Sequence, residues 1–408
     1  MIKVKRTRML PLLLTAALFI ASVAVTAANR GEKRRSAVPT LATADEARRY
    51  TAPDDMRGVW VTYMDLNMQY ESDRSETAFR RKIETIAADS KAFGFNTLVV
   101  QVRPFCDALY PSGLFPYSHI LSGAQGEDPG YDALRIICDV CGKNGLQIHA
   151  WINPYRVIAN GVPEKLSSDN PAVKDEGMLL RVGEDVILNP ADEKARRLIA
   201  DGVLEIAENY PVDGIQFDDY FYPPDPGDQD SRQYEEYADS MPQGKAMDVQ
   251  TWRSFNVDLL LSETYLRLHR RCPGVAFGIS PQGNLGNNAS LNADVVNWCA
   301  KKGFLDYICP QLYFSLDNPA LGFEQALSEW TALDYADGIR LYAGLGAYKA
   351  GSDADEGTWL EDNDILAREY NILEKNKKAN GFMLYSYASL HDEKAQKELE
   401  NFRVLVVS

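Results

Sequence analysis

The chain has 408 residues, of which 45% are hydrophobic and 25% charged, and its formal net charge at pH 7 is −15. This composition is typical of a folded globular protein and excludes collagen-like, low-complexity and intrinsically disordered chains. The excess of acidic residues argues against nucleic-acid binding, which needs a basic face.

The N-terminal segment has a pattern typical of export. Four basic residues at positions 3–8 precede an uncharged, mostly apolar tract at positions 9–28 that ends in small residues. Residues 1–28 are therefore predicted to be a signal peptide or, since 20 such residues could cross a bilayer, an uncleaved membrane anchor. Residues 29–53 are predicted to be a linker. We expect a protein of the cell envelope or the extracellular space that meets a membrane only through this segment.

From residue 54 to residue 408 the chain alternates between short β-rich runs and longer helical patterns. The eight predicted strands are Gly58–Tyr63, Asn96–Pro104, Leu146–Pro154, Gly214–Tyr222, Val275–Pro281, Leu305–Phe314, Ile339–Tyr348 and Gly381–Ser389. The eight predicted helices are Glu76–Phe93, Tyr131–Lys143, Glu193–Glu208, Gln250–Arg271, Ala293–Lys302, Phe323–Leu333, Asn363–Ala379 and Glu393–Phe402.

Eight successive strand–helix units indicate a parallel sheet closed into a (β/α)8 TIM barrel. The alternative is a doubly wound open sheet, which usually has fewer units. That fold also often carries a glycine-rich phosphate loop after its first strand, and none is found here. One barrel domain over residues 54–408 is therefore predicted, with long connections after the second, third and fourth strands.

The cysteine and histidine pattern gives no sign of a metal centre. Cys138 and Cys141 form the one CxxC motif, but they lie in a helical pattern with no second CxxC and no histidine at zinc spacing. We expect small buried residues there, no disulfide framework, no metal and no organic cofactor.

The predicted strand ends are rich in aromatic, amide and carboxyl side chains. The active site of a TIM barrel lies at the C-terminal ends of its strands. Aromatic faces can stack on sugar rings, and amides and acids can bind sugar hydroxyls. The predicted substrate-binding residues are Arg103, His149, Trp151, Asn153, Tyr220, Tyr222, Gln282, Gln311 and Tyr313.

Two of these residues have a second, structural interpretation. A lone buried histidine such as His149 more often completes a hydrogen-bond network than binds substrate. Arg103 could contact the lactyl group of a muramic-type sugar, but pairing with Asp107 is the simpler interpretation.

Glycoside hydrolysis needs one protonated and one ionised carboxyl group across the scissile bond. Asp218, Asp219 and Asp107 are the candidate catalytic residues. In a regular strand, neighbours face opposite ways, so one of Asp218 and Asp219 should face inward, and the apolar pattern favours Asp218. Asp218 is therefore the first choice for the ionised group. Asp107, Asp219 and Asp65 compete for the role of general acid. Alternatively, the paired acids hold Arg103 or Arg156 in a salt bridge.

Several motifs of the chain resemble the glycosyl hydrolase-like 10 family of bacterial exported or envelope proteins. They are RGVWVTY at Arg57–Tyr63, QVRPFCDALYPS at Gln101–Ser112, DPGYDAL at Asp128–Leu134, HAWINPYR at His149–Arg156, FDDYFYP at Phe217–Pro223 and PQLYF at Pro310–Phe314. The resemblance implies a TIM barrel that acts on carbohydrate. Relatives linked to the cell wall further imply cleavage of peptidoglycan strands stripped of their peptides. Cys106 stands where the family usually has a glycine.

Together these patterns predict an exported glycoside hydrolase whose substrate is a bacterial glycan strand, most specifically that of peptidoglycan. Two alternatives stay open: a glycosidase for another polysaccharide, and a barrel that binds glycan without cleaving it. A catalyst needs an acid with a raised pKa opposite an ionised partner, whereas a binding protein needs neither.

Overall fold

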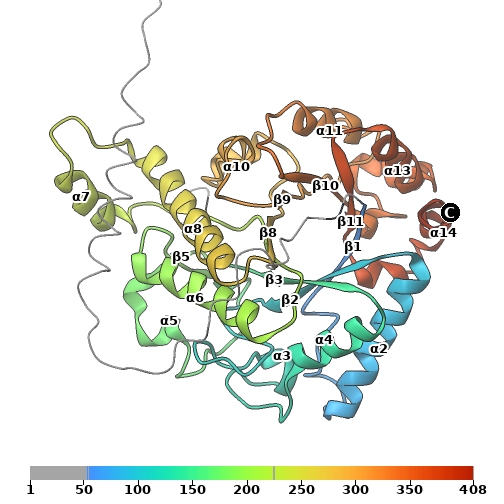
Figure 1. Cartoon of the computed structure of the whole chain (residues 1–408), viewed down its shortest axis with the longest axis horizontal. Coiled ribbons are helices and arrows are strands. Elements are labelled where there is room, and N and C mark those ends of the chain that lie inside the picture. Colours follow the sequence, from blue (N-terminus) through green and yellow to red (C-terminus); the bar gives the residue numbers. More distant parts are fainter. Residues whose placement is uncertain (1–52, 54, 224–225, 408) are drawn as a thin grey trace, which may run out of the picture. The chain divides into compact units, whose positions relative to one another are not determined.

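The structure is a computed structural model that describes residues 53, 55–223 and 226–407. Within them, eight parallel strands form a closed barrel in the order β1-β11-β10-β9-β8-β7-β3-β2 (Figure 1). The strands are β1 (Met56–Val61), β2 (Thr97–Arg103), β3 (Gln147–Ile152), β7 (Gly214–Phe217), β8 (Ala276–Ile279), β9 (Tyr307–Ile308), β10 (Arg340–Leu345) and β11 (Ala379–Leu384). Each overlaps one predicted strand, so the predicted (β/α)8 barrel is confirmed.

The helices that follow the strands form the outer layer (Figure 1). They are α2 (Glu76–Phe93), α4 (Ala133–Lys143), α6 (Glu193–Asn209), α8 (Val249–Arg271), α10 (Val295–Ala300), α11 (Phe323–Thr331), α13 (Ile365–Lys375) and α14 (Gln396–Val406). Helix α2 begins where the Ser75 side chain accepts the amide of Ala78, and it ends at Gly94, whose φ of 94° suits glycine. The helix predicted to run to Ala379 ends at Lys375, because Ala379 already belongs to β11.

The long connections carry structure that the sequence patterns did not predict. A three-stranded antiparallel sheet follows β3, made of β4 (Arg156–Ile158), β5 (Leu179–Val182) and β6 (Asp185–Leu188). The short helices are α3 (His119–Ser122), α5 (Pro171–Lys174), α7 (Ser231–Ser240), α9 (Asn287–Ser290) and α12 (Thr358–Glu361). The 3-10 turns are η2 (Glu176–Met178), η3 (Ala347–Lys349), η4 (Asp355–Gly357) and η5 (Tyr387–His391).

The predicted signal or anchor at residues 1–28 and nearly all of the predicted linker lie outside the described residues. No helix among the described residues has the length and apolar character needed to cross a membrane. Cys138 and Cys141 are buried in α4, as predicted.

The interior of the barrel is filled by side chains rather than open. The hydroxyl group of Tyr307 lies 2.8 Å from Nδ1 of His149 and 3.2 Å from Oε1 of Gln216. Gly278 leaves room for this layer, since a Cβ atom there would come within 1.9 Å of the Tyr307 ring, and Gly214 leaves room for His149. His149 is therefore a core residue, and burial lowers its pKa to about 3.

Two buried carboxyl groups lie in the helix layer, Glu369 on α13 and Glu398 on α14. Oε1 of Glu398 accepts the Leu366 amide, but neither oxygen of Glu369 has a hydrogen-bond partner among the described residues. Burial raises the pKa of Glu398 to about 7 and that of Glu369 well above its usual range, and repulsion from Glu398 adds to the latter.

These two carboxyl groups therefore bind more protons in the folded than in the unfolded state at neutral pH, and their contribution to stability falls as the pH rises from about 4.5 through 7. We expect Glu369→Gln to raise the free energy of unfolding by about 1–3 kcal/mol at pH 8, and less at pH 5, in urea titrations. The control is Glu361→Gln at an exposed position on α12, which should leave the free energy of unfolding unchanged at both pH values. Equal stability of Glu369→Gln and wild type at pH 8 would mean that burial does not keep this carboxyl protonated.

Candidate active site

A pocket of about 240 Å³ opens at the C-terminal ends of the barrel strands. Its aromatic lining consists of Tyr63, Trp151, Tyr220, Tyr313, Tyr348 and Tyr385. Its other lining residues are Thr62, Met64, Gln101, Arg156, Asp218, Asp219 and Gln311. This is the end of the barrel at which the sequence analysis placed the active site.

Both acids that follow β7 line this pocket. Only 3% of Asp218 and 4% of Asp219 is exposed. The expectation that only one of them faces inward assumed a regular strand, but β7 ends at Phe217. Beyond that residue the alternation of a strand no longer holds, so both side chains can turn to the same cavity.

Asp218 is held by a relay of amide side chains. The Tyr63 amide donates to Gln101, whose Nε2 donates to Oδ1 of Asn153 at 2.6 Å, and Nδ2 of Asn153 donates to Oδ2 of Asp218. The relay joins the ends of β1, β2, β3 and β7 and fixes the orientation of the carboxyl group. A guanidinium nitrogen of Arg156 lies 3.9 Å from the same oxygen.

The environment of Asp218 favours its protonated form. Burial raises its pKa to about 7, Arg156 partly opposes this, and the Asp219 charge adds to it. Its second oxygen, Oδ1, accepts no well-formed hydrogen bond among the described residues, although the Trp151 side chain and the Tyr220 amide lie close enough to lower the pKa of the group. Asp218 therefore has a proton to donate near neutral pH and a free oxygen to carry it.

Asp219 lies in a different hydrogen-bonding environment. Nε2 of Gln282 donates to Oδ2, and Nε2 of Gln311 donates to Oδ1 at 3.0 Å. Burial raises the pKa of Asp219 above its usual value, and the two amide donors oppose this rise without cancelling it. Because donors on both oxygens stabilise a carboxylate, Asp219 is the better ionised partner. The two neighbouring acids thus differ in the way that acid–base catalysis requires.

Three tyrosines that follow β9, β10 and β11 form another wall of the pocket. Tyr313, Tyr348 and Tyr385 contact one another with ring centroids 5.6–5.8 Å apart. Burial raises the pKa of Tyr385 to about 12 and that of Tyr313 well above its usual range, so their hydroxyl groups stay protonated. Such a wall offers both apolar faces and hydroxyl donors to a sugar ring.

The structure brings eight of the twelve predicted site residues to this pocket. Six line it, namely Trp151, Asp218, Asp219, Tyr220, Gln311 and Tyr313, and Asn153 and Gln282 bind its carboxyl groups. The other four, Arg103, Asp107, His149 and Tyr222, do not line it. Tyr222 is buried and donates to Asp230 at 2.9 Å.

Arg103 lies in the helix layer rather than at the pocket. Its guanidinium stacks over the Phe115 ring at 4.4 Å and lies against Gly202 of α6. The alternation of β2 would place it on the same face as Gln101. A register shift between Gln101 and Arg103 in the pairing with β3 breaks that alternation.

Asp107 orders the loop after β2. It is fully buried, and its oxygens accept the Phe105 amide at 3.1 Å and Nε2 of Gln125 at 3.3 Å. The preceding Cys106 has a φ of 53°, in the left-handed region that favours glycine. The backbone thus explains why a glycine suits the position before Asp107.

Seven lining residues were outside the predicted set: Thr62, Tyr63, Met64, Gln101, Arg156, Tyr348 and Tyr385. Most come at or directly after the end of a strand, and that position was the signal that could have found them. Arg156 is held at the pocket by the pairing of β4 with β6, which the sequence patterns did not predict.

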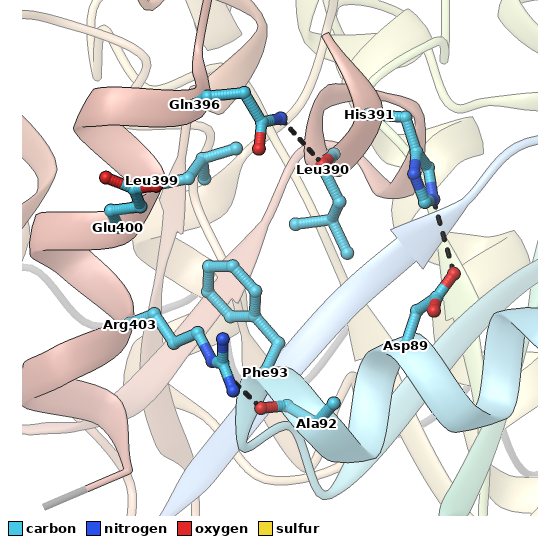
Figure 2. Close-up of a pocket in the computed structure, with 9 residues that line it drawn as sticks. All are labelled: Asp89, Ala92, Phe93, Leu390, His391, Gln396, Leu399, Glu400 and Arg403. Atoms are coloured by element: carbon cyan, nitrogen blue, oxygen red, sulfur yellow. Dashed lines mark hydrogen bonds and ion pairs between the residues drawn. The ribbon is translucent and has the colours of Figure 1, made fainter. Parts of the chain in front are cut away.

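A second cavity of about 260 Å³ lies outside the barrel between α2, η5 and α14 (Figure 2). Nε2 of His391 lies 3.3 Å from Asp89, and Arg403 and Gln396 donate to the backbone oxygens of Ala92 and Leu390. These groups already bind one another, and the cavity lacks a pair of buried acids. No group of three potential ligands among the described residues could hold a metal ion.

The profile of the family described as Glycosyl hydrolase-like 10 matches residues 55–361. The chain belongs to this family. Glycosyl hydrolase YngK of Bacillus subtilis is 32% identical over 377 residues, which cover 87% of this chain and 71% of YngK. Glycosyl hydrolase DigH of Escherichia coli K12 is 29% identical over 379 residues, or 84% of this chain and 85% of DigH. The motif resemblance is thereby confirmed, and this family member is a glycoside hydrolase.

Solved structures show the same fold at low sequence identity. The glycoside hydrolase domain of PgaB (BpsB) from Bordetella bronchiseptica aligns with a TM-score of 0.56 at 15% identity, over 85% of this chain and 99% of that domain. An alpha-L-fucosidase from Paenibacillus thiaminolyticus aligns with a TM-score of 0.54 at 13% identity, over 86% of this chain and 49% of the fucosidase.

Proposed function

We propose that this protein is an exported glycoside hydrolase that cleaves peptidoglycan glycan strands, with Asp218 as general acid and Asp219 as the ionised carboxylate. The observation that carries the proposal is the pocket with two buried carboxyl groups of unlike environment facing a wall of tyrosines. Export is supported by the basic and apolar pattern at residues 3–28.

This assignment differs from the sequence analysis, which preferred Asp218 as the ionised group and left the general acid open among Asp107, Asp219 and Asp65. A general acid must hold its proton at the working pH, and the pKa of Asp218, at about 7, meets this requirement. Asp219 receives amide hydrogen bonds on both oxygens and so keeps its charge more readily. Asp107 takes no catalytic role in this proposal, because it lies outside the pocket.

The size of the pocket favours glycan strands that carry no stem peptides. Its volume of about 240 Å³ lies below the roughly 300–1,000 Å³ of sites for drug-sized ligands, so it suits a single sugar ring. Removal of the stem peptide also frees the lactyl carboxylate of the muramic sugar. Arg156 lines the pocket and stacks over the Tyr220 ring at 4.8 Å, where it can pair with that carboxylate.

The full-length protein should release new reducing ends faster from peptide-free strands than from intact peptidoglycan. Arg156→Gln should lower kcat/KM on peptide-free strands about tenfold more than on N-acetylglucosamine oligomers, which lack lactyl groups, because a charge-assisted hydrogen bond contributes roughly 1.5–3 kcal/mol. Arg156 also affects the pKa of Asp218, and this effect is the same for both substrates. The oligomers therefore serve as the control that separates it from the loss of pairing with the lactyl carboxylate.

No new reducing ends from either peptidoglycan preparation would reject the proposed substrate. Cleavage of a different polysaccharide would then identify a glycosidase with another specificity. Binding without cleavage that survives Asp218→Asn would instead identify a glycan-binding barrel.

A further inference from the structure

We propose that the nucleophile in this reaction is the 2-acetamido group of the substrate itself, so that the pocket is specific for a 2-acetamido sugar at the cleaved bond. The inference deepens the proposed function and rests on it. It follows from where the two acids lie in the barrel and from what faces them.

The two acids lie on one wall of the pocket. Asp218 and Asp219 are consecutive residues after β7, so their Cα atoms are about 3.8 Å apart. A mechanism that uses two protein carboxyls needs them on opposite sides of the sugar, with the carboxyl groups themselves about 5–5.5 Å apart for retention and about 6.5–9.5 Å apart for inversion. Side chains that leave neighbouring Cα atoms and turn to the same cavity do not enclose a sugar ring between them. A second carboxyl should therefore come from the far side of the barrel.

The facing wall holds no carboxyl group among the described lining residues. In the closed strand order, three strands separate β7 from β11 in either direction, so β11 lies directly opposite. The residue after β11 is Tyr385, and Tyr348 follows β10 beside it. Since the pKa of Tyr385 is raised to about 12, its hydroxyl is not an ionised nucleophile at neutral pH.

Asp65, after β1, is the acid that could have supplied the missing group. Its Oδ2 accepts both the amide of Thr62 at 2.7 Å and the hydroxyl of Thr62 at 2.8 Å, and it does not line the pocket. Asp65 thus closes the turn after β1, and the facing wall offers hydroxyl groups and aromatic faces instead of a base.

A 2-acetamido sugar removes the need for a facing carboxyl. Its glycosidic oxygen and its amide nitrogen are bonded to neighbouring ring carbons, C1 and C2. Two adjacent residues can therefore reach both atoms, Asp218 the glycosidic oxygen and Asp219 the N–H group. The acetamido carbonyl oxygen then attacks C1 from the other face of the ring and does the work of a protein nucleophile.

In the first step, Asp218 gives its proton to the glycosidic oxygen as the bond between that oxygen and C1 breaks. The electron pair stays on the oxygen, which leaves as an alcohol. The acetamido carbonyl oxygen bonds to C1 and forms a bicyclic oxazolinium ion, whose N–H group hydrogen-bonds to the Asp219 carboxylate. The amide donors Gln282 and Gln311 keep that carboxylate ionised and in place.

In the second step, a water molecule attacks C1 and transfers one proton to Asp218. The bond between C1 and the acetamido oxygen breaks, its electrons restore the amide, and both acids return to their starting forms. One water is consumed for each bond cleaved. Because C1 is attacked twice from opposite faces, the product keeps the configuration of the substrate.

The test uses the full-length protein, peptide-free glycan strands and the same strands after de-N-acetylation. We expect proton NMR of the first product to show retained configuration at C1, and we expect de-N-acetylated strands to be cleaved at least a hundredfold more slowly. The thiazoline derived from N-acetylglucosamine, in which sulfur replaces the attacking oxygen, should inhibit competitively. Calorimetry should show it binding about tenfold or more weakly to Asp219→Asn.

Asp65→Asn is the matched control and should keep wild-type product configuration and thiazoline affinity. An inverted product, or equal rates on acetylated and de-N-acetylated strands, would overturn the acetamido mechanism while leaving the hydrolase in place. Loss of hydrolysis in Asp65→Asn at unchanged thiazoline affinity would overturn it too, and would identify Asp65 as the facing base. No cleavage of peptide-free strands by the wild type would reject the proposed function, and the mechanism with it.

Discussion

Asp218→Asn is expected to lower kcat/KM on peptide-free glycan strands by about 10²–10⁴-fold, the usual contribution of a positioned general acid. The substitution keeps the shape of the side chain, so the hydrogen bond from Asn153 is replaced by a similar polar contact. Because a carboxyl group with a pKa of about 7 is already partly protonated in the folded state, its loss should not destabilise the protein. Reducing-end assays and urea titrations measure the two effects separately.

The pH profile gives this prediction a second readout. A general acid works in its protonated form, so kcat/KM of the wild type should fall as the pH rises above about 7. Arg156 lowers the pKa of Asp218, so Arg156→Gln should move this alkaline limb to higher pH. If the alkaline limb of the pH profile persists in Asp218→Asn, the general acid is another residue.

Asp107→Asn is the control among the acids predicted from the sequence. Asp107 binds the loop after β2 and does not line the pocket. Its variant should therefore keep the alkaline limb of the pH profile when activity is calculated per mole of folded protein. A loss of activity equal to that of Asp218→Asn, with normal folding, would return Asp107 to the catalytic site.

Gly278→Ala is expected to cost about 3 kcal/mol or more of folding free energy, at the upper end of the range for overpacked cores. A Cβ atom at this position would lie 1.9–2.3 Å from three atoms of the Tyr307 ring. The ring cannot move freely, because its hydroxyl group is bonded to His149 and Gln216 inside the barrel. Strand β8, which contains Gly278, would therefore have to shift, together with its C-terminal end.

The matched control for this variant is Gly142→Ala in α4. Among the described residues, apart from its chain neighbours and the backbone of its own helix, no atom lies within 4 Å of a Cβ atom placed there. Since alanine is also the better helix former, this variant should be slightly more stable than the wild type. Urea titrations of both variants measure the difference. Equal stability of the two would show that the interior layer can rearrange around an added methyl group.

The barrel and the position of its active-site end could be predicted from the sequence because their causes are local. Strands and helices follow from short-range patterns, and helix ends such as Gly94 follow from single residues. Once eight units alternate, the strand ends must gather at one rim. For this reason Asp218, Asp219, Gln311 and Tyr313 were correctly expected there.

The roles of individual side chains depended on contacts between distant segments. Whether Asp219 joins Asp218 depended on the residue at which β7 ends. Whether Arg103 faces the pocket depended on a register shift against β3, and whether His149 binds substrate depended on the space left by Gly214. The alternation of residues along one strand cannot predict where the strand ends, how its register shifts or how much space a neighbouring strand leaves, because it describes a strand without its neighbours.

The sequence by itself thus determined the architecture, the family motifs and the rim at which the candidate active site lies. Only the tertiary structure decided which acid is buried without donors on both oxygens and which wall lacks a carboxyl group. Protonation depends on desolvation and on hydrogen bonds from other strands, here from Asn153 on one side and from Gln282 and Gln311 on the other. These groups are separated by more than 60 residues from the acids they bind, so only the closed barrel brings them together.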